Sequence, residues 1–120
     1  MVYKTNVLEI GSMVPAFAEE MLIVLFGTTA PNELRDISVI HEPESNSQKN
    51  ILKVGTRLEM GGQTYEVTAV GNAANANFDE LGHVSIYFKD SDDLLPGAIS
   101  VQPSIFPDVK ISEVIKFSND

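Results

Sequence analysis

Gly61 and Gly62 stand between two strand-like runs, residues 56–60 and 63–70. Glycine adopts positive φ without steric cost, and a two-residue turn between antiparallel strands requires that conformation. A chain that reverses direction so tightly must place the two runs side by side. The pattern therefore predicts a β-hairpin over residues 56–70.

Short apolar runs bounded by turn residues fill most of the remaining chain, whereas long amphipathic helical patterns are missing from the sequence. Residues 31–36 favour one helical turn because Pro31 suits a first turn, and residues 71–79 are typical of a connection with room for a second. Short strands at this spacing predict an all-β barrel or sandwich formed by residues 1–120 as a single domain. Further strands are expected at 3–10, 21–26, 37–41, 84–88, 98–101 and 111–117.

Composition excludes several classes of protein. The longest apolar run, residues 21–26, is far shorter than the roughly 20 residues of a membrane-spanning helix,. The chain contains no cysteine, which excludes disulfides and thiolate metal sites and is compatible with a reducing compartment,. We therefore expect a cytoplasmic protein that does not span the membrane.

The chain is acidic, with 8 basic and 17 acidic residues and a net charge of −9. Phosphates of nucleic acids and of anionic membranes would be repelled, so neither is expected as a partner. Two interpretations of the charge remain open. It could serve solubility, or it could steer the chain toward a basic protein partner.

Two histidines, His41 and His83, limit the nucleophilic chemistry available to the chain. Imidazole is largely uncharged near neutral pH and can attack an electrophile. His41 ends the apolar run 37–41 before a polar loop, residues 42–50, so we expect it at an exposed strand end. Alternation over residues 81–88 puts His83 on the more polar face of its strand. Structural roles for both histidines remain an alternative.

Other kinds of site find little support. Together with a distant His83, the residues His41, Glu42 and Glu44 do not have the spacing of a metal site, so no metal is expected. The sequence has no nucleophile elbow, and Gly61-Gly62 is typical of a hairpin turn rather than of a phosphate-binding loop. No cofactor is expected either.

One combination of motifs resembles a known family. The motifs follow one another from the first predicted strand to the last, and the most specific part lies between residues 65 and 84. The chain is similar to the glucitol/sorbitol-specific IIA components of the bacterial phosphoenolpyruvate-dependent sugar phosphotransferase system. The motifs are Gly27-Thr-Thr-Ala-Pro-Asn-Glu-Leu34, Ile37-Ser-Val-Ile-His41, Val54-Gly-Thr-Arg-Leu58, Gly62-Gln-Thr-Tyr-Glu-Val-Thr-Ala-Val-Gly71, Glu80-Leu-Gly-His-Val84 and Leu95-Pro-Gly97.

The resemblance implies a small cytoplasmic β-barrel that works as a phosphotransferase component through a phosphohistidine. Such a component accepts a phosphoryl group from the phosphocarrier HPr and passes it to a cysteine of its IIB partner, and the residue matching the phosphorylated histidine is His41. Chemistry agrees, because a phosphoramidate on imidazole gives up its phosphoryl group where a serine ester would not. His83 is a candidate orienting or phosphate-binding partner.

The alternative function is a non-catalytic β-barrel binding module in which both histidines are structural. At an exposed His41, replacement by Gln should cost little stability, within about 0.5 kcal/mol. Which ring nitrogen reacts, whether His41 and His83 lie close together and how many copies assemble are left to the tertiary structure.

Overall fold

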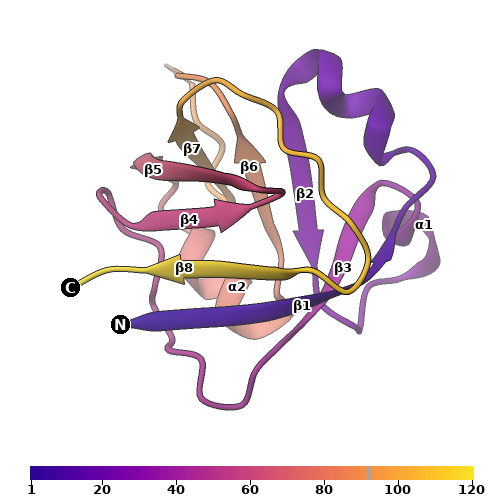
Figure 1. Ribbon diagram of the computed structural model, residues 1–120, viewed down its shortest axis with the longest axis horizontal. Coiled ribbons are helices and arrows are strands. Elements are labelled where there is room, and N and C mark those ends of the chain that lie inside the picture. Colours follow the sequence, from indigo (N-terminus) through magenta and orange to yellow (C-terminus); the bar gives the residue numbers. More distant parts are fainter. Residues whose placement is uncertain (92) are drawn as a thin grey trace.

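The computed structural model describes residues 1–91 and 93–120 and forms a closed barrel of eight strands in the order β1-β3-β2-β6-β7-β5-β4-β8 (Figure 1). The predicted all-β barrel with short helical connections is confirmed. The strands are β1 (Val2–Ile10), β2 (Leu22–Phe26), β3 (Ser38–Pro43), β4 (Arg57–Met60), β5 (Gln63–Val70), β6 (Val84–Tyr87), β7 (Ala98–Gln102) and β8 (Val114–Ser118). The helical segments are η1 (Val14–Glu20), α1 (Asn32–Arg35) and α2 (Ala74–Leu81).

The predicted hairpin is confirmed as β4 and β5. Met60 pairs with Gln63, and both intervening glycines have positive φ, 58° at Gly61 and 78° at Gly62. Closure of the barrel uses pairs of distant strands: β1 is antiparallel to both β3 and β8, while β2–β3 and β6–β7 are parallel. The two chain ends lie together on one side (Figure 1) because β1 pairs with β8.

Strand alternation directs one face of each strand into the barrel. The predicted core face of β6 is confirmed, since Val84 and Ile86 are fully buried, as is Phe88 just after the strand. Tyr3 and Val7 on β1 point inward in the same way. A large apolar core results inside the barrel, and its burial supplies most of the driving force for folding,.

Helix α2 is longer than the single turn expected between residues 71 and 79. Ala74 and Phe78 are four residues apart, so they share one helix face, and both are buried against the barrel core,. Gly82 ends the helix in the left-handed conformation, at φ 66°,. The Asn- and Ala-rich sequence gives only a weak helical signal, and packing of Phe78 makes up for it.

Three further elements differ from expectation. The segment η1, with Pro15 in its first turn, was not predicted. Strand β8 begins at Val114 rather than 111, because Ser112 has positive φ and Glu113 closes a turn onto Lys110. Strand β3 continues two residues beyond His41, since Glu42 and Pro43 still pair with β1.

Close backbone contact holds the end of α2 against the end of β2. The amide of Gly27 donates to the Leu81 carbonyl at 2.9 Å, and a Cβ on Gly82 would lie 2.9 Å from the Gly27 nitrogen. Only glycine fits at position 82, both for this contact and for its positive φ. Within the described ranges, the helical segments are all too short and too polar to span a bilayer.

Candidate functional site

His41 lies in the interior of β3 and is fully buried. The expectation of an exposed side chain at a strand end is therefore wrong. Its register partner on β1 is Val7, and the strand continues to Pro43. Alternation explains the burial: His41 and Val39 share the face of β3 that points into the barrel,.

Both ring nitrogens of His41 are hydrogen-bonded. Nε2 lies 2.7 Å from the Gly82 carbonyl oxygen, and Nδ1 lies 2.6 Å from the Thr5 hydroxyl oxygen. A carbonyl can only accept, so Nε2 carries the proton and donates it. In the neutral ring Nδ1 then has a lone pair and accepts from the Thr5 hydroxyl.

Burial lowers the pKa of His41 below its ordinary value, and the hydrogen bond to Gly82 opposes this only in part. Removing a charged imidazolium from water is costly, so the buried ring favours its neutral form. At neutral pH the side chain is therefore uncharged, which is the form that can act as a nucleophile.

Aromatic side chains pack beside the imidazole. Phe78 stacks on His41 with ring centroids 5.8 Å apart. The ring centroid of Tyr3 lies 4.6 Å from that of Phe78 and 6.0 Å from that of Phe117. Burial raises the pKa of Tyr3, and the charge of Asp79 raises it further. The phenol therefore stays protonated, and it can donate a hydrogen bond at any physiological pH.

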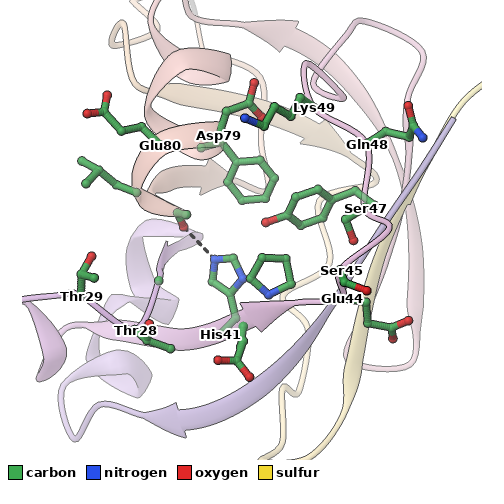
Figure 2. A pocket seen from close by; sticks show the side chains of 17 residues that line it. Thr28, Thr29, His41, Glu44, Ser45, Ser47, Gln48, Lys49, Asp79 and Glu80 are labelled. Carbon is green, nitrogen blue, oxygen red and sulfur yellow. Dashed lines mark hydrogen bonds between the residues drawn. The ribbon is translucent and has the colours of Figure 1, made fainter.

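A pocket of about 380 Å³ opens above His41 and Phe78. Figure 2 shows His41 between Thr28 and Thr29 on one side and the loop carrying Ser45 and Ser47 on the other, with the end of α2 across from it. The lining mixes hydroxyl, amide and backbone groups with charged ones. The charged lining residues are Glu42, Glu44, Lys49, Asp79 and Glu80.

The loop after β3 is held in place by hydrogen bonds to α2 and β1. The Asp79 carboxylate accepts from the backbone N–H of Asn50, with N–O distances of 3.0 and 3.2 Å. Ser47 donates to the Lys4 carbonyl at 2.8 Å and accepts from the Lys4 amide at 3.0 Å. These bonds keep one wall of the pocket fixed relative to His41.

Arg35 fixes the opposite wall. Its guanidinium donates to the carbonyls of Thr28 and Ala30 and forms an ion pair with Glu9 at 2.8 Å. A planar guanidinium can satisfy several acceptors at once, which suits a loop whose carbonyls have no strand partner. The Thr28 and Thr29 side chains are thereby presented at the pocket.

His83 points away from this pocket. Its Nδ1 lies 3.1 Å from the Leu25 carbonyl, and its ring stacks on Phe26 with centroids 4.5 Å apart. Phe26 belongs to a small cluster with Ala30 and Ile40 on the outer face of the barrel. The structure thus brings Gly82, not the ring of His83, to His41.

Sequence reasoning missed the two groups that hold the imidazole. Thr5 occupies an inward position of an apolar strand, but nothing local distinguishes it from a surface threonine. Gly82 carries a weak signal as a glycine that follows a helix. In the described part of the chain, no group of three or more histidine or acidic side chains is placed to hold a metal ion.

Comparison with known proteins identifies a family and agrees with the fold. A family model for the "PTS system glucitol/sorbitol-specific IIA component" matches residues 2–116. The glucitol/sorbitol-specific EIIA component of Escherichia coli (strain K12) is 33% identical over 121 residues, covering 99% of this chain and 96% of that protein. The corresponding Shigella flexneri component is 29% identical over 120 residues, with the same coverage.

A solved structure is also similar. The crystal structure of the PTS system IIA component from Enterococcus faecalis V583 matches with a TM-score of 0.85 and 30% identity. The match covers 93% of this chain and 96% of that one. The barrel described above is therefore shared with a IIA component across nearly its whole length.

Proposed function

Because the chain belongs to the glucitol/sorbitol-specific IIA components of the sugar phosphotransferase system, we propose that it carries a phosphoryl group on His41. The donor is phospho-HPr, and the acceptor is a cysteine of the cognate IIB component in the cytoplasm. The observation that carries this proposal is the position of His41: of the chain's two histidines, it is the one that lines the pocket.

The chemistry is two displacements at phosphorus. In the first, a lone pair on His41 forms the new N–P bond as the N–P bond of the donor breaks and its electron pair returns to the donor imidazole. In the second, the IIB thiolate forms an S–P bond and the electron pair of the N–P bond returns to His41. Such transfers depend on in-line positioning and on donors that face three charged oxygens.

The pocket offers suitable donors on both walls. Hydroxyl groups come from Thr28 and Thr29 on one wall and from Ser45 on the other, and Lys49 is the cation in the lining. Phosphoryl oxygens on His41 would also face the protonated phenol of Tyr3.

Acidic residues at the same pocket keep the phosphoryl group transferable. Glu42, Glu44, Asp79 and Glu80 surround a group that carries about two negative charges,. Their repulsion disfavours a long-lived phosphohistidine and favours a partner that brings positive charge. A relay protein needs both properties.

His83 remains a candidate orienting partner only through Gly82, its neighbour in the chain. Its ring bonds to Leu25 and stacks on Phe26, and these contacts favour a packing role. The alternative function, a binding module with structural histidines, is supported by the burial and complete hydrogen bonding of His41.

One labelling experiment separates the two functions. Incubation with phosphoenolpyruvate, Enzyme I and HPr should add one phosphoryl group, bound through a linkage that is labile in acid and stable in base. His41→Gln should accept none while His83→Gln still accepts one. Full labelling of His41→Gln would show that the site is wrong, and no labelling of folded wild type would favour the binding module.

A further inference from the structure

Thr5 is a buried polar residue in an otherwise apolar set of inward positions on β1. Its neighbours on that face, Tyr3 and Val7, belong to the main core, and all three are shielded from solvent. A buried hydroxyl costs free energy unless it is hydrogen-bonded. Within the described residues, the bond that satisfies this hydroxyl is the one to His41 Nδ1, at 2.6 Å.

The two ring nitrogens of His41 face different surroundings. Nε2 meets the carbonyl of Gly82, which lines the pocket, whereas Nδ1 meets Thr5, which is fully buried and outside the lining. A phosphoryl group delivered through the pocket therefore reaches Nε2. Since the ring itself is shielded from solvent, the Gly82 carbonyl has to withdraw from Nε2 to admit it.

The proton on Nε2 is in the wrong place for this reaction. A nitrogen that attacks phosphorus needs its lone pair, and in the structure that nitrogen donates to Gly82,. In the neutral ring, Nε2 has a free lone pair only when the proton is on Nδ1. When the ring opens transiently to solvent, proton exchange can move the proton from Nε2 to Nδ1 with no net change in charge, and Nδ1–H then needs an acceptor inside the barrel.

A hydroxyl can accept a hydrogen bond from Nδ1–H and can also donate one to Nδ1. A carbonyl can only accept and an amide N–H can only donate, so neither could do both. We propose that Thr5 is a positioning residue for phosphoryl transfer, donating to Nδ1 of His41 in the resting protein and accepting from Nδ1–H when Nε2 attacks and carries the phosphoryl group. This inference rests on the proposed function of His41. Thr5 thus supports both protonation patterns of the ring without a shift of its own backbone in β1.

Three variants test the role. Thr5→Val keeps the shape but removes the hydroxyl, and the rate of phosphoryl gain from phospho-HPr should fall about tenfold or more. Thr5→Ser keeps the hydroxyl and should restore most of the rate. Thr56→Val is the matched control, because Thr56 is equally buried and hydrogen-bonded, but its hydroxyl donates to the Ile51 carbonyl and not to His41. The folded fraction of Thr56→Val should accept a phosphoryl group from phospho-HPr at the wild-type rate.

Nitrogen-15 spectra of the His41 ring supply a readout that packing alone would not change. The wild type should show hydrogen on Nε2 before labelling, and phosphorus on Nε2 with hydrogen on Nδ1 afterwards. Thr5→Val should shift the proportion of the two neutral forms, and Thr5→Ser should restore it.

Phosphorus on Nδ1 would overturn the inference, as would a Thr5→Val variant with wild-type rate and wild-type ring spectra. If folded wild type accepts no phosphoryl group, the proposed function fails, and this inference fails with it. Normal labelling of the wild type with no effect of Thr5→Val defeats the inference alone.

Discussion

The two histidines have one feature in common and differ in the rest of their surroundings. Each places a ring nitrogen near a backbone carbonyl, His41 near Gly82 and His83 near Leu25. The second nitrogen of His41 meets the buried hydroxyl of Thr5, and His41 lines a pocket, whereas the ring of His83 stacks on Phe26 outside the barrel. Residue type does not distinguish an imidazole that lines a pocket from one that packs on an aromatic ring; the surroundings do.

The largest expected difference between them is in phosphoryl acceptance. His41→Gln removes the nucleophile and should lower labelling by phospho-HPr below detection, because amide nitrogen does not form a phosphoramidate under these conditions. His83→Gln should change the rate by less than about threefold, because the lost ring touches neither the pocket nor His41. Radiolabel uptake measured against time gives both rates.

A strong fall in the His83→Gln rate, with the fold intact by circular dichroism, would break the comparison. It would restore His83 as an orienting partner acting through Gly82. Wild-type labelling of both variants would remove the phosphoryl site from the two histidines altogether.

His41→Gln should also lower the free energy of unfolding more than His83→Gln does. His41→Gln disturbs two hydrogen bonds in a fully buried site, so the free energy of unfolding should fall by about 1–3 kcal/mol. This replaces the expectation of about 0.5 kcal/mol for an exposed residue. His83→Gln should cost about 1 kcal/mol or less, since His83 is only partly buried,. Urea unfolding at pH 7.5 measures both, and equal losses would contradict the difference in burial.

The pH dependence of stability should also follow His41. Its pKa is lowered in the folded state, so between that value and the ordinary value near 6.5 the unfolded chain binds more protons,. The associated stability is fully present above pH 6.5 and is lost as the pH falls through the folded-state pKa. Urea unfolding of the wild type at pH 7.5 and 5.5 should show this loss.

His41→Gln is the control for that measurement. The variant should lose less stability than the wild type over the same pH interval, because its side chain does not titrate. An identical pH dependence in the two proteins would show that other groups account for it.

The smallest expected effect concerns the acidic residues of the pocket. If they attract a basic partner, the rate of phosphoryl gain should fall several-fold between low and high salt, since charges are screened beyond about 10 Å at 0.1 M. Glu80→Gln should slow the low-salt rate slightly. Glu20→Gln should leave that rate unchanged, because Glu20 lies in η1, outside the pocket lining. A rate that does not change with salt would favour the other interpretation, in which the negative charge serves solubility.

Much of the fold could be predicted because local rules determine it. The hairpin depends on two glycines that accept positive φ, and the core face of β6 depends on period-two alternation,. The full length of helix α2 was not predicted, because its stability comes from burying Ala74 and Phe78, a contact that exists only after the barrel closes. Helix propensity over eight residues is too weak to reveal it.

The sequence by itself determined that the chain forms a small acidic β protein with two imidazoles as its candidate nucleophiles. It also pointed to His41 through the family motifs. Only the tertiary structure decided that His41 is buried, that Thr5 and Gly82 hold its two nitrogens, and that His83 faces elsewhere. The reason is sequence distance: Thr5 and Gly82 lie 36 and 41 residues from His41. Pairing of β1 with β3 brings Thr5 within hydrogen-bonding range, and the contact between the end of α2 and the end of β2 places Gly82.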